Sequence, residues 1–309
     1  MDHTSDPARE AYRAWIGKHA VIAEPPRTLW HYTSAYGLQG IMDSEVLWAT
    51  STEFLNDSAE LRYGRDLFLQ IAAEVAQSAS ASTAAWIERL TDPVSGPLAP
   101  WLESNVELYV TCFCSRADLL SQWRAYGGGD TAGGYAIGFT PPGHVQAWMQ
   151  GAKHELNLRQ VVYVEDRQRS ICEEILRDLV DYLDHDPADQ DALDNFSKSF
   201  VDALAEVASW CKHSAFEEEQ EWRFSYMRTT DPSQLPVHHR VASGLLVPFV
   251  KLALPSGVGA RHDRLPISQI QCGPSTDPRR KEAGLRSLLS KTQAYDSVEV
   301  LSSRSPARI

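Results

Sequence analysis

The chain has 309 residues, of which 43% are hydrophobic and 23% are charged, and its formal net charge is −12. These values are typical of a globular protein with a sizeable core, and the acidic balance argues against binding nucleic acid through a broad basic surface. No apolar run approaches the roughly 20 residues of a membrane span, and the N-terminus is too polar for a secretory signal, so we expect a cytoplasmic protein.

The first predicted element is a helix over residues 6–20, within an N-terminal arm that covers 1–27. Residues 29–34, LWHYTS, then predict a strand. A helix is expected to follow, because Leu38, Ile41 and Met42 recur at helical spacing. Further strands are predicted at 46–50, 108–113, 135–139, 161–164, 221–227, 245–254, 267–272 and 297–301.

Helices are predicted between many of these strands. Two helical insertions are expected near 66–100 and 167–210, and a closing helix at 279–291. The segment 115–134 is expected to be irregular because glycines gather at its end, and the tail 302–309 is expected to be disordered.

The order of elements predicts the fold class. Helices interrupt strands that are often consecutive, which indicates an α+β fold with a mainly antiparallel or mixed sheet. We expect one domain over residues 28–301.

Common site motifs are missing from the sequence. It contains no GxxxxGK[ST], GxSxG, HExxH or GxGxxG pattern. The five cysteines are scattered, which fits reduced thiols, and their spacing predicts no metal site. Cys112 and Cys114 are expected to point to the same side of one strand.

Four short groups of polar and aromatic residues remain as candidate sites. Taken alone, each has an ordinary explanation: a hydrogen-bonded core histidine, a helix cap, an aromatic anchor before a turn, and a solvated acidic face. The groups are His31, Tyr32 and Thr33; Asn56, Asp57 and Glu60; Trp123, Arg124 and Tyr126; and Glu217, Glu218, Glu219, Glu221 and Arg223.

The last group has an informative pattern. Glu219 and Glu221 are two residues apart as a strand begins, so we expect both carboxylates on one side of it. Two carboxylates on one face repel each other and are unfavourable to bury, which favours a cleft over a core position. Arg223 continues that face and could neutralise one of them, while Trp222 and Phe224 point into the core.

Together, the motifs resemble one bacterial family, the domain of unknown function 2971. The matching pieces run from Leu29 to Pro274 and are HYTS, GLxxIxxSxxLWAT, FLNDxxEL, CFCS with WRAYGG, and KHxAFxxEQEWRF. The same skeleton is similar to the ADP-ribosyltransferase superfamily. Its opening resembles those of DarT-like DNA-modifying toxins and of tRNA 2′-phosphotransferases. The resemblance implies a split sheet with a cleft that binds NAD.

The resemblance also implies roles for single residues. His31 matches the histidine of the first strand, and Glu221 resembles the catalytic glutamate of an ExE motif. The middle position is filled by Trp123, Tyr126 or Ser115, and we take Tyr126 as the catalytic candidate beside His31 and Glu221. The residues implied to bind NAD are His31, Tyr32, Thr33, Asn56, Asp57, Trp123, Arg124, Glu219 and Arg223.

These roles fit the chemistry of nicotinamide–ribose cleavage. A carboxylate at Glu221 would stabilise positive charge that develops on the ribose. His31 and Thr33 would hold the ribose region, a ring from Tyr126 or Trp123 would stack on nicotinamide, and Arg124 would pair with the pyrophosphate.

The function implied is NAD-dependent transfer of ADP-ribose to a protein or nucleic acid, or hydrolysis of NAD. Such a protein would serve as a toxin or anti-phage defence effector, with an antitoxin or defence partner protein. Two alternatives stay open. One is a catalytically silent sensor of NAD, ADP-ribose or another nucleotide, and the other is a metal-dependent nuclease using Asp57, Glu60, Glu219 and Glu221.

Overall fold

The computed structural model describes most of the chain between residues 26 and 305. The described residues are 26–55, 59–92, 107–127, 133–140, 157–185, 201, 204–205, 207–228, 234–242, 244–252, 264–291 and 295–305. For 59–61, 157, 179 and 182–185 only the backbone is described. The helix predicted over 6–20, Asn56 and Asp57 lie outside the described residues.

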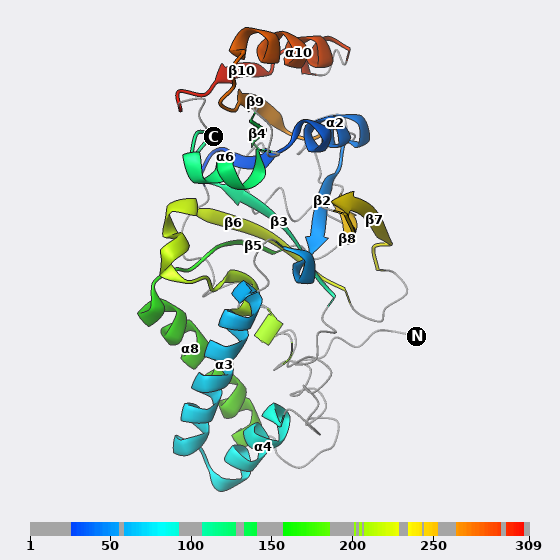
Figure 1. Ribbon diagram of the computed structural model, residues 1–309. Coiled ribbons are helices and arrows are strands. Elements are labelled where there is room, and N and C mark those ends of the chain that lie inside the picture. The colour runs from blue at the N-terminus through cyan, green and yellow to red at the C-terminus, as the bar shows by residue number, and fades with distance from the viewer. Residues whose placement is uncertain are drawn as a thin grey trace.

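The chain has an α+β fold, as its sequence predicts, with one large mixed sheet (Figure 1). The strands are β1 (Leu29–Thr33), β2 (Leu47–Ser51), β3 (Leu108–Cys114), β4 (Tyr135–Phe139), β5 (Asn157–Gln160), β6 (Glu221–Met227), β7 (Val237–Ala242), β8 (Leu245–Leu252), β9 (Ile267–Cys272) and β10 (Glu299–Ser302). The helices are α2 (Ala35–Ser44), α3 (Ala59–Ser78), α4 (Ala81–Thr91), α6 (Leu120–Tyr126), α8 (Glu165–His185) and α10 (Pro278–Ser290), with short 3₁₀ turns η1 (Thr52–Phe54) and η2 (Ser214–Glu219).

The sheet branches at β3. Its order is β10-β9-β4-β1-β3-β2-β8-β7, and β6 joins β3 to β5 off this path. On one edge β3 pairs with β6 along its whole length. On the other edge it pairs with β2 at Tyr109 and Val110 and with β1 only at Cys114. The strands β1 and β2 therefore diverge along this edge of β3.

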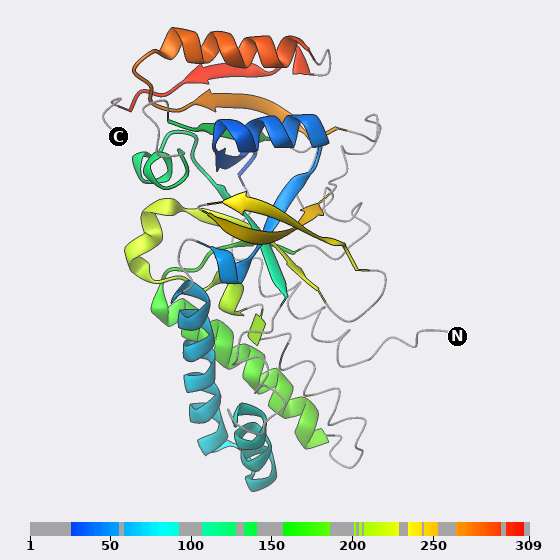
Figure 2. The same ribbon diagram turned by 45° about the vertical axis from the view of Figure 1, so that its right-hand side comes forward.

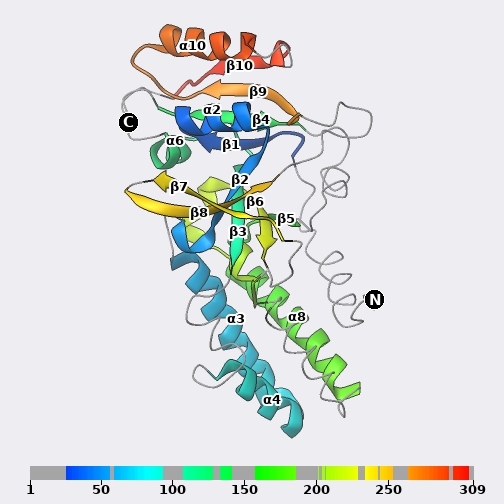
Figure 3. The same cartoon turned by 90° about the vertical axis from the view of Figure 1, so that its right-hand side faces the viewer.

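The main apolar core lies on one face of these strands. Trp222 and Phe224 belong to it, whereas Glu221 and Arg223 alternate to the opposite face of β6, as the sequence predicts. Leu38, Ile41 and Met42 of α2 pack into the same core. In Figures 2 and 3, α2 lies beside β1 and β4. The β7–β8 hairpin lies on the other side of the place where β1 and β2 diverge.

A second apolar core holds the helical insertions together. It joins α3, α4 and α8 with the segment around Trp210, and it lies at the opposite end of the molecule from α10 and β10 (Figure 1). The predicted insertions near 66–100 and 167–210 therefore pack on each other more than on the sheet. None of the helices within the described ranges is long and apolar enough to cross a membrane.

Local chemistry sets the ends of α2 and α10. The Ser34 side chain caps α2 by accepting a hydrogen bond from the Gly37 amide at 3.2 Å. The helix ends where Glu45 adopts a left-handed conformation with φ of 52°. Asp277 caps α10 in the same way through the amide of Arg280, directly before Pro278 in the first turn.

Four sequence predictions were wrong in position or kind. Residues 120–126, expected to be irregular, form α6, because Leu119 and Trp123 lie one helical turn apart and both bury themselves against Tyr32. The strand expected at 161–164 lies instead at Asn157–Gln160, and Val162 makes only a bridge to Cys211. The strand β7 was missed because its sequence, VHHRVA, carries polar and charged side chains at a sheet edge.

The fourth error concerns the tail. Residues 303–305, expected to be disordered, are tied to Asp118. That carboxylate accepts hydrogen bonds from the Ser303 hydroxyl at 2.5 Å and the Arg304 amide at 2.8 Å. It also accepts one from the Trp123 indole at 2.7 Å, so the tail and α6 share one anchor.

Candidate functional site

The strand pairing of β3 and β6 places thiol and carboxylate side chains on one face. Cys112 is opposite Arg223 and Cys114 is opposite Glu221. Because directly paired residues point to the same side of a sheet, Cys112, Cys114, Glu221 and Arg223 all share the face away from the main core. This confirms that Cys112 and Cys114 point the same way.

Glu221 is the centre of a buried ion cluster. Arg223 donates from Nε to Oε1 at 2.7 Å and from Nη2 to Oε2 at 2.8 Å, and Lys212 Nζ lies 3.3 Å from Oε2. Lys212 also donates to Glu219 at 2.5 Å, so it bridges the two carboxylates that were expected to share a face. Burial alone would raise the pKa of Glu221, but the Arg223 and Lys212 cations lower it to about 2. Glu221 is therefore ionised at every physiological pH.

Tyr126 reaches this cluster from the last turn of α6. Burial raises the pKa of Tyr126, and the charge of Glu221 raises it further. The residue is still 38% exposed. Tyr126 is therefore a neutral, partly exposed phenol that the Glu221 carboxylate influences through its charge.

His31 contacts the backbone of Cys112 from the edge of β3 that pairs with β1 and β2. Its Nδ1 lies 2.9 Å from the Cys112 carbonyl oxygen, and its ring lies 5.8 Å from that of Phe113. Burial lowers the pKa of His31, so the ring is neutral at pH 7. A neutral ring that faces a carbonyl through Nδ1 carries its proton there, which leaves Nε2 as an acceptor.

His31 and Glu221 thus meet different atoms of one residue. His31 approaches the Cys112 carbonyl in the gap that opens between β1 and β2, and Glu221 lies beside the Cys112 thiol on the face of the strand. Their side chains make no hydrogen bond to each other within the described part of the chain. The register places the two side chains on opposite faces: Trp30 pairs with Cys114 and so shares the face of Glu221, whereas His31 pairs with Ile137 of the main core. His31 is therefore linked to the Glu221 cluster only through the backbone of Cys112, and the two side chains do not face one cleft.

A further cation acts on His31. Arg240 of β7 lowers the His31 pKa by its charge, although burial has the larger effect. Its Nη2 donates to the Thr50 hydroxyl at 3.0 Å, and its guanidinium lies 6.0 Å from the centre of the Trp48 ring. The site therefore continues from Cys112 along β2 to the edge strand.

Several predicted ligand residues have other roles. Trp123 is only 1% exposed and packs edge-on against Tyr32, with ring centres 4.6 Å apart, so neither ring is open for stacking on a ligand. The Tyr32 hydroxyl joins the Arg116 carbonyl to the Leu119 amide. Both rings support α6, the helix that carries Tyr126.

The remaining predicted residues are less closely tied to the cluster. Arg124 is exposed on α6. Thr33 packs against the start of α2, since a Cβ added at Gly37 would lie 1.9 Å from its hydroxyl oxygen. Asn56 and Asp57 lie outside the described residues, and of Glu60 only the backbone is described.

Sequence reasoning missed four residues of this site. Cys112 was read only as a strand residue, Lys212 as part of a motif, and Arg240 and Trp48 were not considered. The period-two alternation gives the faces of β3 and β6 but not the register between them, so it could not pair Cys112 with Arg223. No local signal identifies Arg240, because its strand was itself missed.

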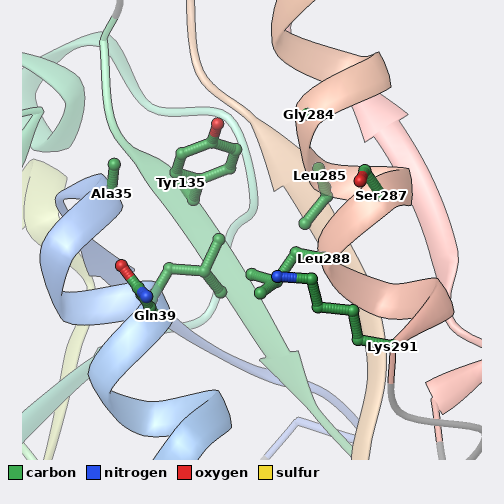
Figure 4. A pocket seen from close by; sticks show the side chains of 9 residues that line it. Ala35, Gln39, Tyr135, Gly284, Leu285, Ser287, Leu288 and Lys291 are labelled. Atoms are coloured by element: carbon green, nitrogen blue, oxygen red, sulfur yellow. The ribbon is translucent and has the colours of Figure 1, made fainter.

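A cavity lies elsewhere in the described part of the chain. It has a volume of about 280 Å³ and opens between α2 and α10 over β4 (Figure 4). Leu38, Leu285 and Leu288 form its apolar walls, with Tyr135 at its base and Lys291 at its rim. None of the predicted site residues lines it, so the chemistry described above, rather than this cavity, defines the candidate site.

The comparisons with known proteins identify a family and nothing further. Residues 122–224, about a third of the chain, match the family described as "Protein of unknown function (DUF2971)", which is the family that the motifs resemble. The matched range begins in α6 and ends in β6, and it includes Tyr126, Glu221 and Arg223. No curated protein and no solved structure matches this chain.

Proposed function

We propose that this chain, assigned to the DUF2971 family through residues 122–224, binds NAD as a substrate and transfers its ADP-ribose unit to a macromolecule. The observation that carries the proposal is that Cys112 links the three positions His31, Tyr126 and Glu221. Its side chain lies by Glu221, whose charge also acts on Tyr126, and its carbonyl oxygen meets His31 from the other face of the sheet. The three residues come from β1, α6 and β6, three elements far apart in the sequence. These are the three positions that the resemblance to ADP-ribosyltransferases implies.

Each of the three side chains is in a state that suits the reaction. Glu221 stays ionised, so its carboxylate would stabilise the positive charge that develops on the ribose as the bond to nicotinamide breaks. Neutral His31 offers Nε2 as an acceptor for a ribose hydroxyl. Tyr126 offers an exposed ring surface on which nicotinamide could stack.

The chemical step is a substitution at the ribose C1′. The bond to the nicotinamide nitrogen breaks, and its electron pair leaves with nicotinamide. A nucleophile on the acceptor forms the new bond to C1′ and loses its proton to solvent. A protein or nucleic-acid acceptor gives ADP-ribosylation, as in a toxin or defence effector held in check by a partner protein, whereas water gives NAD hydrolysis.

One observation favours the alternative of a catalytically silent nucleotide sensor. Glu221 is only 5% exposed, and Arg223 occupies both of its carboxylate oxygens. A catalytic role therefore requires that ligand binding loosen the Arg223 contact. The nuclease alternative has no comparable support: within the described ranges no three His, Cys, Asp or Glu side chains group as metal ligands.

Release of nicotinamide from NAD tests the proposal, measured by chromatography with and without a bacterial extract as the source of acceptors. We expect release by the wild type and a loss of about 100-fold or more in Glu221→Gln. Glu218→Gln, an exposed neighbour in η2, is the matched control and should keep full activity.

The glutamine variant also weakens the ion cluster, so a second variant is needed. Tyr126→Phe leaves Arg223 and Lys212 untouched and should reduce release while the circular dichroism spectrum stays that of the wild type. If ADP-ribose binds but the wild type leaves NAD intact and no protein or nucleic acid in the extract gains the mass of ADP-ribose, the sensor replaces the enzyme.

A further inference from the structure

Arg240 is a partly buried cation that makes no ion pair with any acidic residue the structure describes. The chain carries 41 Asp and Glu residues, yet within the described ranges none of them lies within ion-pair distance of this guanidinium. Burial lowers the pKa of Arg240, and no carboxylate opposes that effect. A partly desolvated cation is unfavourable unless an anion joins it, so this position calls for a negative ligand.

Two hydrogen-bond donors at the same place are also unsatisfied. Arg240 Nε and Trp48 Nε1 are both buried from solvent, and neither has an acceptor among the residues that the structure describes. The guanidinium lies 6.0 Å from the centre of the Trp48 ring, so the two donors belong to one locality. Buried donors are nearly always paired in folded proteins, and two neighbouring exceptions point to an acceptor that binds between them.

The position of these donors suggests which acceptor binds. Arg240 is hydrogen-bonded to Thr50 of β2. Thr50 pairs with Val110 of β3, two residues before the Cys112 carbonyl that His31 meets. The charge of Arg240 also acts on His31, whose Nε2 is proposed above to hold a ribose hydroxyl. In a nucleotide, the group next to the ribose is phosphate. The planar fork of arginine matches the oxygens of phosphate, and an indole N–H can donate to a further oxygen.

We propose that Arg240 and Trp48 form the subsite that binds the pyrophosphate of the nucleotide ligand, beside the ribose at His31. This inference rests on the proposed function for the identity of the ligand and deepens it. It also replaces the sequence-based assignment of the pyrophosphate to Arg124, which is exposed on α6. Thr50, which accepts from Arg240 Nη2, orients the guanidinium.

Calorimetric titrations of the full chain test the subsite. The probes are ADP-ribose, inorganic pyrophosphate and adenosine, and the variants are Arg240→Gln and Trp48→Phe. Arg279→Gln, exposed on α10, removes the same charge elsewhere and is the matched control.

We expect Arg240→Gln to weaken ADP-ribose binding by about tenfold or more and Trp48→Phe by about fivefold, with adenosine affinity within about twofold of wild type. The phenylalanine keeps an aromatic ring beside Phe249, whose ring lies 4.7 Å away in the wild type, but it removes the N–H and the outer part of the indole that lies against Gly40. The adenosine affinity and the melting temperature of the variant separate the two losses. Pyrophosphate should bind the wild type and compete with ADP-ribose.

Three results would overturn the subsite. The first is no binding of ADP-ribose or pyrophosphate to the wild type. The second is an Arg240→Gln variant that is less stable to heat but binds ADP-ribose as the wild type does, which would make Arg240 a purely structural partner of Trp48 and Thr50. The third is equal weakening by Arg279→Gln, which would show a general charge effect. Loss of NAD turnover alone bears on the proposed function, because these affinities are measured without turnover.

Discussion

Replacing Glu221 by glutamine should weaken the protein in a way that depends on pH. The carboxylate lies between Arg223 and Lys212 and is 5% exposed. Its pKa falls from an ordinary value of 4.5 to about 2 in the folded protein. Each tenfold change in an acid constant is worth about 1.4 kcal/mol, so ionised Glu221 contributes about 3 kcal/mol to the free energy of unfolding at pH 7.

The sign of the pH effect follows from the direction of this shift. A carboxyl whose pKa is lowered by folding stabilises the protein above its unfolded pKa, and that stability is lost as the pH falls through 4.5 toward 2. Between pH 6 and pH 3 the wild type should therefore lose about 2 kcal/mol that the glutamine variant does not lose. At pH 7 the variant should be less stable by about 3 to 5 kcal/mol, because the buried Arg223 loses its carboxylate partner and Lys212 keeps Glu219 but not Glu221.

Urea unfolding of both proteins at pH 6, 5, 4 and 3, followed by tryptophan fluorescence, measures the difference directly. Glu218→Gln is the control, since this neighbour is exposed in η2 and should show no gap at any pH. A gap between wild type and Glu221→Gln that stays constant from pH 6 to pH 3 would refute the reasoning. It would mean that the carboxylate is not stabilised by its cations in the folded state.

Three further predictions concern the framework around the site. Lys281→Met should lower the free energy of unfolding by about 2 to 4 kcal/mol, because Lys281 donates to the carbonyls of Gly133, Gly134 and Gly273. Lys291→Met, at the end of the same helix, is the control and should change it by less than about 0.5 kcal/mol. Equal effects of the two variants in chemical unfolding would contradict this account. Gly133→Ala should lower the melting temperature, since this residue has φ of +49° and an added Cβ would lie 2.3 Å from the Pro274 oxygen. Gly284→Ala should preserve or raise the melting temperature, because its added Cβ would meet nothing within 4 Å. The reverse order of melting temperatures would be incompatible with the described backbone. Asp118→Ala should lower the free energy of unfolding by about 2 kcal/mol and speed proteolysis of the C-terminal tail. The reason is that the Trp123 indole and the Ser303 and Arg304 donors lose their shared acceptor. Unchanged cleavage rates would show that the tail has another anchor.

The fold class and many elements could be predicted from periodicity. The strands at 29–33 and 221–227 and the helix at 35–44 follow from alternation, spacing and a serine cap, which are local signals. The misplaced elements depend on tertiary contacts. Helix α6 is stabilised because Leu119 and Trp123 pack against Tyr32, which lies on a strand distant in the sequence. The segment β7 is a strand because it pairs with β8.

The site shows the same limit. The shared face of Glu221 and Arg223 follows from a period of two, and it holds in the structure. The partners Cys112, Lys212 and Arg240 come from other elements, and only the register between strands brings them together. The sequence motifs nominated Trp123 because aromatic rings commonly stack on ligands, yet burial against Tyr32 gives this ring a packing role.

The most direct test of the central claim is a crystal structure of the protein with bound ADP-ribose or NAD. We predict that a ribose hydroxyl lies within hydrogen-bond distance of His31 Nε2, with the sugar facing Tyr126 and Glu221 and the pyrophosphate at Arg240. A nucleotide bound in the cavity between α2 and α10, or anywhere that leaves His31 and Glu221 without contact to it, would contradict the claim.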